Sequence, residues 1–188
     1  MQYDSESWDL TPPIEKGAWL HNPYPGVSYA ERFCRTAHDL GFPVVLTPGV
    51  DLCNNKPNPA YPGNAPQYPV PAGERNYESY LRYRLATAAR WLSPGDMYEY
   101  QSQALETDPA LYESVTAKVA AQVSDVSRGV TFLAGIGRTE ANWDGATAAQ
   151  LTAAARTVTS LVAGYWPNVD ENATRVQAMI GFLKNLGY

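Results

Sequence analysis

The sequence has few residues of the kinds that hold transition metals or cross-link a chain: two cysteines and two histidines among 188 residues. It contains neither CxxC nor a Cys/His metal spacing, which argues against a zinc site. It also lacks the Gly-rich patterns GxGxxG and GxxxxGK[ST] that cradle phosphates, so we expect no bound nucleotide and no other cofactor.

Basic residues are in the minority, with 14 Lys and Arg against 19 Asp and Glu. The net charge of −5 argues against a nucleic-acid or anionic-membrane partner, because both require a basic face. No apolar run approaches the roughly 18 residues of a membrane span. The hydrophobic fraction of 45% suits a chain that buries a core.

The two cysteines, Cys34 and Cys53, leave two readings open. They form a disulfide if the chain is exported, or they are two buried free thiols.

Aromatic residues are numerous and unevenly distributed, with 13 Tyr and 5 Trp against 4 Phe. Tyr and Trp combine a flat apolar face with a polar tip, which suits sugar rings and other flat polar ligands. Packing of tyrosines in solvent-exposed loops is the alternative explanation.

The apolar pattern alternates between short strands and amphipathic helices. Strands are expected at 1–4, 43–48, 96–103, 130–135 and 164–168, and helices at 28–40, 76–92, 109–127, 147–162 and 172–186. Gly41 is expected to end the first helix, and Asp108 and Pro109 to begin the third. A Pro/Tyr-rich insertion at 53–73 is too long to be a simple connection, so it is a lid, a binding loop or a disordered insert.

Five strands, each followed by a helix, predict one α/β domain over 1–188 with a parallel sheet. Two architectures fit this pattern. One is part of a TIM-like (β/α) barrel, whose full form needs about 250 residues. The other is an open, flavodoxin-like doubly wound sheet.

In both architectures the ligand site lies at the carboxyl ends of the strands. Asp4 and Glu6 share one face of the first strand, about 7 Å apart, since side chains alternate along a strand. By the same alternation Glu99, Gln101 and Gln103 share a face, and Tyr98 and Tyr100 take the other. The candidate catalytic residues are therefore Asp4 and Glu6, and the candidate substrate-binding residues are Trp8, Gln101, Gln103, Glu106, Trp166 and Asn168.

A carboxylate pair with flanking amides and a tryptophan is what glycoside hydrolysis requires. We assign the general acid to Glu6, because the apolar face of Trp8 would keep its carboxyl protonated. Asp4 is then the base, the nucleophile or an electrostatic stabiliser. Capping of the segment that follows is the structural alternative for both carboxylates. Of the histidines, His38 is expected to complement a helix C-terminus, and His21 lies in a loop.

The order of several short blocks resembles a family of (β/α)-barrel proteins, often exported and common in actinobacteria, that look like glycoside hydrolases. The blocks are YDxExW followed by TP at 3–12, HxxG leading into TPxxDL at 38–52, QxQ at 101–103, LAG at 133–135 and GYWPN at 164–168.

The resemblance implies that Asp4, Glu6, Gln101, Gln103, Trp166 and Asn168 gather at one barrel mouth. It also implies an extracellular or cell-surface location and further strands before the first block.

Three functions are consistent with these residues. The first is a carbohydrate-active hydrolase that uses Asp4 and Glu6. The second is a noncatalytic carbohydrate-binding or surface interaction protein. The third is a divalent-metal-assisted hydrolase with Asp51 or Asp170 as further ligands, which the scarcity of histidine disfavours. The expected partner is a carbohydrate or small polar ligand. An open five-stranded sheet would also expose its edges, so we expect self-association or a covering partner.

Overall fold

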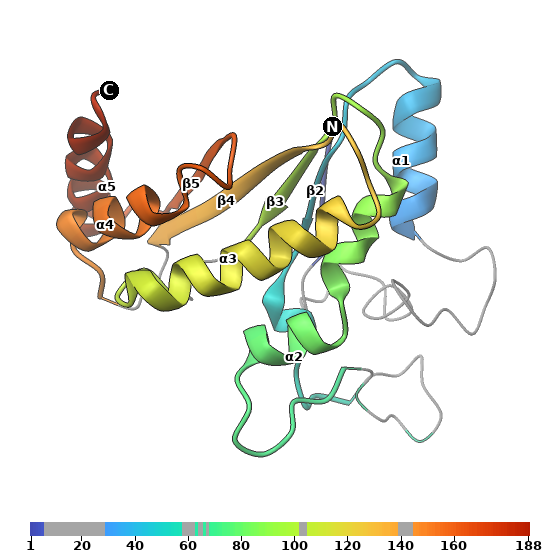
Figure 1. Ribbon diagram of the computed structural model, residues 1–188, viewed down its shortest axis with the longest axis horizontal. Coiled ribbons are helices and arrows are strands. Elements are labelled where there is room, and N and C mark those ends of the chain that lie inside the picture. The colour runs from blue at the N-terminus through green and yellow to red at the C-terminus, as the bar shows by residue number, and fades with distance from the viewer. Residues whose placement is uncertain (6–28, 58–62, 64–65, 67, 102–104, 139–144) are drawn as a thin grey trace. The chain divides into compact units, whose positions relative to one another are not determined.

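A computed structural model of the protein describes residues 1–5, 29–57, 63, 66, 68–101, 105–138 and 145–188. Strands and helices alternate along these residues (Figure 1). The elements are β1 (Gln2–Ser5), α1 (Tyr29–Asp39), β2 (Val45–Pro48), the 3-10 turn η1 (Val50–Leu52), α2 (Asn76–Arg82), the 3-10 helix η3 (Leu85–Trp91), β3 (Met97–Tyr100), α3 (Pro109–Ser124), β4 (Thr131–Arg138), α4 (Ala148–Val158), β5 (Gly164–Val169) and α5 (Ala173–Leu186).

The five strands form one parallel sheet in the order β1-β2-β3-β4-β5. The predicted alternation of strands with helices is confirmed. A flavodoxin-like sheet has the order 2-1-3-4-5, so the observed consecutive order differs from that alternative. Right-handed crossovers between consecutive neighbours place their helices on the same face of a sheet.

The prediction of a single helix over 76–92 is wrong, because α2 ends at Arg82 and η3 begins at Leu85, with Arg84 between them. This residue has φ +55°, in the left-handed region that residues other than glycine rarely adopt. The Thr87 hydroxyl donates to the Arg84 carbonyl at 2.8 Å, and the Arg84 guanidinium contacts the Asp125 carboxylate at 2.9 Å. These side-chain bonds stabilise the break, which helical periodicity alone does not reveal.

Two predicted helix ends are confirmed. The Asp108 carboxylate accepts the Leu111 amide at 3.1 Å at the start of α3, where Pro109 is the first residue. After α1, Gly41 has φ +79° and its amide donates to the His38 carbonyl. Glycine adopts this conformation without a Cβ penalty, which explains why the helix ends there.

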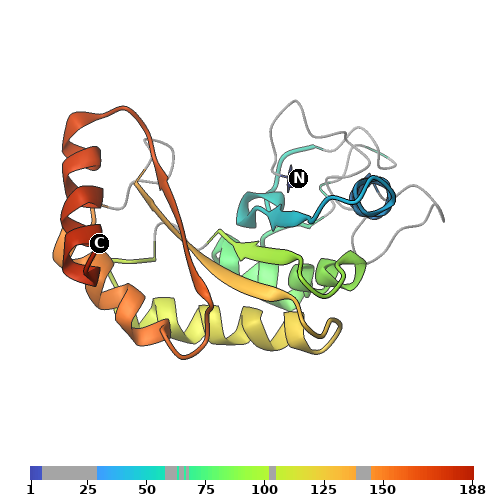
Figure 2. The ribbon, with the colours of Figure 1, turned by 90° about the horizontal axis from the view of Figure 1, so that it is seen from above.

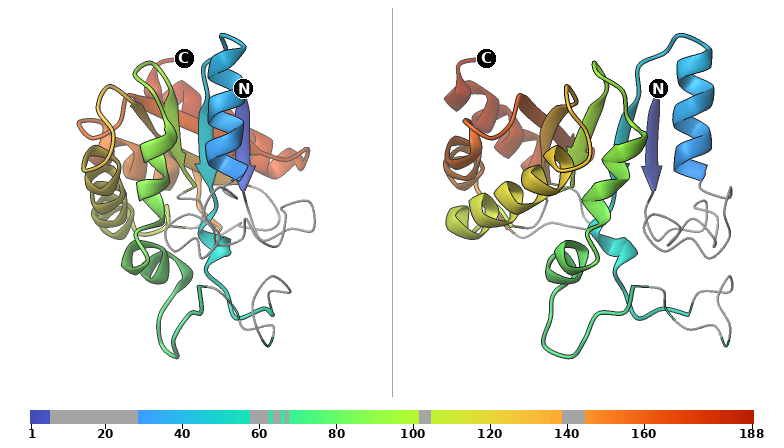
Figure 3. Two further views of the ribbon diagram at one scale, coloured as in Figure 1. Left: turned by 90° about the vertical axis from the view of Figure 1, so that its right-hand side faces the viewer. Right: turned by 45° about the vertical axis from the view of Figure 1, so that its right-hand side comes forward.

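The chain has two compact units, a first of Met1–Tyr98 with Ala121–Thr131 and a second of Glu99–Ala120 with Phe132–Tyr188. In the first unit β1 lies beside β2 and α1 (Figure 3). The Tyr3 ring lies 5.1 Å from the Phe33 ring of α1, between centroids, and the buried Tyr80 and Tyr98 hydroxyls are hydrogen-bonded. Tyr3 of β1 and Tyr98 of β3 thus lie on the side of their strands that contacts helices.

In the second unit β4 and β5 run side by side, with α4 and α5 next to them (Figure 2). Their common core consists of Ile136, Ala146, Leu151, Ala155, Met179 and Phe182. Tyr165 of β5 packs against this cluster and meets the Phe182 ring edge-on. Ile136 and Tyr165 therefore mark the helix-packed face of this unit, and their sequence neighbours point to the opposite face.

Candidate functional site

The predicted catalytic pair lies only in part within the described residues. Asp4 belongs to β1, is exposed, and pairs in register with Thr47 of β2. Thr47 is fully buried, and its hydroxyl donates to the Tyr3 carbonyl at 3.3 Å. Glu6, Trp8, Gln103 and His21 lie outside the described residues, so the convergence of Asp4 and Glu6 stays a prediction.

Two described candidates of the second unit, Trp166 and Asn168, lie on one face of β5. Gly135 pairs with Trp166, and Gly137 pairs with Asn168. Paired positions of parallel strands project to the same side of a sheet, so these four residues share the face opposite Ile136 and Tyr165. Trp166 is half-buried and Asn168 is exposed. The β4–β5 face therefore presents a ring and an amide beside two residues that have no side chain.

A buried carboxyl lies against the first of these glycines. Glu99 is 1% exposed and projects from β3 to the face opposite Tyr98 and Tyr100, as alternation predicts. Its Oε1 atom occupies the space that a Cβ on Gly135 would need, and the Tyr100 carbonyl oxygen lies only 2.8 Å from the same point. Only glycine fits at position 135 without displacing this carboxyl and this backbone.

A second buried carboxyl holds the next glycine of β4. Glu106 is 0% exposed, and its Oε1 accepts the Gly137 backbone N–H at 3.0 Å. The fully buried Tyr112 of α3 donates its hydroxyl to the Gly135 carbonyl, also at 3.0 Å. Sequence reasoning expected Glu106 to bind substrate. In the structure its Oε1 atom is bonded to the backbone of β4, and its substrate-binding role stays a prediction.

Gln101 directly follows β3 and is half-buried in the second unit. Its Cα lies 3.2 Å from the Cβ that a side chain at Gly135 would carry. Glu99 and Gln101 therefore lie next to Gly135, and Glu106 lies next to Gly137. On β5, Trp166 is the neighbour of Gly135 and Asn168 is the neighbour of Gly137.

Asp170, a candidate metal ligand by its position after β5, is engaged by an arginine. Its carboxylate accepts Arg175 Nε at 2.8 Å and lies 2.7 Å from Arg175 Nη2. Asn172 caps α5 by accepting the Thr174 and Arg175 amides. Among the described residues, no group of three or more His, Cys, Asp or Glu side chains is arranged to hold a metal ion.

His38 has a structural environment in the first unit. Its Nε2 lies 2.7 Å from the Asp96 carboxylate, which is 3% exposed and also accepts the Val44 and Ser93 amides at 2.8 and 2.7 Å. The expected structural role of His38 is thus supported by its hydrogen bond to Asp96, in addition to its place at the end of α1.

Cys34 and Cys53 are both buried and free, which decides between the two readings left open by the sequence. Burial raises the pKa of the Cys53 thiol to about 12. Only the thiolate is an effective nucleophile, so Cys53 is unsuited to nucleophilic catalysis near neutral pH.

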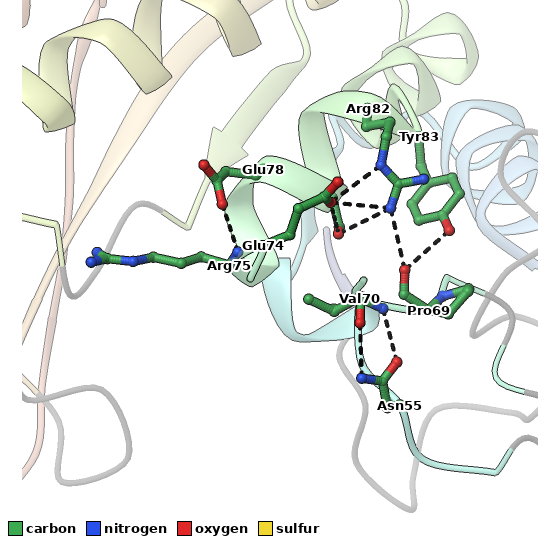
Figure 4. A network of polar contacts seen from close by, with 9 residues as sticks. Asn55, Pro69, Val70, Glu74, Arg75, Glu78, Arg82 and Tyr83 are labelled. Carbon is green, nitrogen blue, oxygen red and sulfur yellow. Dashed lines mark hydrogen bonds and ion pairs between the residues drawn. The ribbon is translucent and has the colours of Figure 1, made fainter. Parts of the chain in front are cut away.

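The Pro/Tyr-rich insertion is held at both of its ends (Figure 4). The Asn55 side chain exchanges two 2.9 Å hydrogen bonds with the Val70 backbone, as a neighbouring strand would. Arg82 and Tyr83 of the α2 end donate to the Pro69 carbonyl at 3.3 and 3.1 Å. The base of the insertion is therefore a closed loop fixed to α2.

Glu74 contacts α2 next to the insertion (Figure 4). Its carboxylate accepts the Ser79 hydroxyl at 2.7 Å and Arg82 Nε at 3.2 Å. The Ser79 hydrogen bond and, after it, Arg82 lower the pKa of Glu74. The Arg82 guanidinium also lies 4.1 Å from the centre of the Tyr83 ring, a cation–π contact.

Sequence reasoning did not include Glu99 or Tyr112 among the site residues. The signal that could have found Glu99 was its position on the same strand face as Gln101. The second signal was the Gly135-Ile-Gly137 spacing, which leaves two successive same-face positions of a strand without side chains.

No protein-family model matches this chain, and a search of curated proteins gives no significant match. Within the part of the chain that the structure describes, none of the helices has the length and apolar character needed to cross a membrane.

Proposed function

We propose that the protein is a carbohydrate-active hydrolase of the glycoside-hydrolase type, with a TIM-like arrangement of its β/α units. Asp4 and Glu6 are its catalytic carboxylates, and Gln101, Trp166 and Asn168 bind the sugar. The consecutive strand order supports the barrel-like arrangement, because neighbouring strands of a TIM barrel follow one another in sequence.

The observation that carries the proposal is the β4–β5 face of the second unit. Trp166 and Asn168 stand two residues apart beside Gly135 and Gly137, on the side of the strands opposite the helix-packed residues. An indole ring binds the apolar face of a sugar, and an amide exchanges hydrogen bonds with its hydroxyls.

The catalytic assignment rests on the first strand. Asp4 is exposed in β1. Glu6 lies outside the described residues, and its place on the same face as Asp4 is the expectation from strand alternation. One carboxyl protonates the leaving oxygen, and the other acts as base or nucleophile. The resemblance to exported barrel proteins supports an extracellular or cell-surface location for this activity.

The test is the release of reducing ends from a panel of neutral, amino and acidic polysaccharides by the purified chain. With an active substrate identified, Glu6→Gln and Asp4→Asn are expected to lower kcat about 10²–10⁴-fold, the usual contribution of a positioned acid or base. Glu113→Gln, an exposed change on α3, is the matched control. Full activity of Glu6→Gln would refute the acid assignment. Glycan binding without turnover by the unmodified chain would favour the noncatalytic alternative.

A further inference from the structure

The end of β4 is held by side chains that come from the segment just after β3. Glu106 accepts the Gly137 amide, and Tyr112 donates to the Gly135 carbonyl. The two bonds have the same length, 3.0 Å, and both side chains are fully buried. The backbone of β4 is thus fixed at two alternate residues by one donor and one acceptor.

The two side chains have a rigid base. Asp108 caps α3 through the Leu111 amide, and its carbonyl accepts the Tyr112 amide at 2.9 Å in the first helical turn. Glu106 lies two residues before the cap. Both groups therefore belong to a single capped helix start, so a shift of either is resisted by the whole turn.

The strand register carries this constraint to the candidate sugar-binding residues. Gly135 pairs with Trp166, and Gly137 pairs with Asn168. Paired residues of adjacent strands are about 4.8 Å apart, so each anchored glycine lies directly beside one of the two ligand candidates. Neither glycine has a side chain, so the indole and the amide have the β4 backbone itself as their neighbour on the adjacent strand.

We propose that Glu106 and Tyr112 are positioning residues that set the placement of Trp166 and Asn168 through the backbone of β4. This inference rests on the proposed function for its consequence, since the site that they position is the proposed sugar-binding face. Glu106 acts as a fixed acceptor for the Gly137 amide, a task that the side-chain oxygen of glutamine performs equally well.

The test uses the full chain labelled with 5-fluorotryptophan, with the Trp166 signal assigned by its loss in Trp166→Phe. Glu106→Gln is expected to keep the fluorine chemical shift of Trp166, whereas Glu106→Ala is expected to move or broaden it. Tyr112→Phe removes a single hydroxyl and is expected to produce a smaller change of the same kind. Glu113→Ala on the exposed side of α3 is the control. Should Glu106→Ala fail to fold, Tyr112→Phe supplies the comparison.

Binding to an array of neutral, amino and acidic glycans provides the functional readout. Glu106→Ala is expected to lose about tenfold to a hundredfold in affinity at temperatures where it is fully folded, and Glu106→Gln to bind as the unmodified chain does. An unchanged Trp166 signal in both Glu106→Ala and Tyr112→Phe would overturn the positioning role. Equal effects of Glu106→Gln and Glu106→Ala would overturn it as well. Absence of glycan binding by the unmodified chain would instead refute the proposed function and leave the fluorine comparison to decide the positioning role.

Discussion

The substitution Gly135→Ala is the sharpest probe of how β3 and β4 fit together in the second unit. A Cβ at this position would lie 2.8 Å from the Tyr100 carbonyl oxygen and would also meet the Glu99 carboxyl. The carboxyl is the end of a side chain and can turn away. The carbonyl belongs to the neighbouring strand, so it moves only if the backbone of β3 moves.

The expected cost follows from this distinction. Overpacking a filled interior by one carbon destabilises a protein by about 1–3 kcal/mol, and the upper end applies where backbone atoms must shift. For a chain of this size, a loss of about 3 kcal/mol lowers Tm by roughly 6–12 °C. Gly164→Ala is the matched control, because its added Cβ would meet only the Leu133 side chain, at an ordinary 3.6 Å. That change is expected to stay within about 1 kcal/mol.

Urea denaturation followed by circular dichroism, together with thermal melting, measures both free energies of unfolding. A Gly135→Ala variant that is as stable as Gly164→Ala would refute the close approach of β3 and β4 at this position. It would also show that position 135 can hold a side chain next to Glu99 and Trp166.

Three further predictions concern the first unit. Asp96→Ala removes the buried acceptor shared by His38, Val44 and Ser93, so we expect a loss of about 2–5 kcal/mol in urea denaturation, and a loss below about 0.5 kcal/mol would contradict the bonding seen. The Ser79 hydrogen bond and, after it, Arg82 lower the pKa of Glu74. The ionised carboxylate therefore stabilises the folded state fully above the ordinary glutamate pKa of about 4.3, and this stabilisation is lost as the pH falls through the lowered pKa. Glu74→Gln should therefore flatten this part of the stability–pH curve, and limited proteolysis should cut the 53–73 insertion of the unmodified chain faster at acidic than at neutral pH; an unchanged curve would contradict a stabilising role of the Glu74–Arg82 pair. Ellman's reagent should modify neither Cys34 nor Cys53 in the folded protein and both after denaturation, because both thiols are buried and the pKa of Cys53 is raised to about 12; rapid labelling of the native chain would contradict this.

The order and type of the strands and helices were predictable from the sequence, because hydrophobic periodicity reports directly on which side of an element is buried. Tyr98 and Tyr100 were correctly separated from Glu99 by the same rule. The break between α2 and η3 was not predictable in this way. It depends on the left-handed conformation of Arg84, which is stabilised by Thr87 and by Asp125, 41 residues away in the chain.

The candidate site was predictable to the level of strand ends and strand faces. Alternation and the rule that sites lie at the carboxyl ends of parallel strands place Trp166 and Asn168 together. The role of Glu106 depends on a backbone contact with Gly137, which comes 31 residues later in the chain. No local pattern encodes such a contact. A buried glutamate bound to a strand amide and a glutamate facing a ligand look the same in sequence.

The measurement that tests the central claim most directly is hydrolysis in ¹⁸O-labelled water, with the glycans released from the panel analysed by mass spectrometry. If the protein is a glycoside hydrolase, the unmodified chain incorporates one ¹⁸O atom per bond cleaved, and Glu6→Gln reduces this incorporation by about 10²–10⁴-fold. Glycan binding without any ¹⁸O incorporation would contradict the claim, because Trp166 and Asn168 would then serve a protein that binds carbohydrate and does not cleave it.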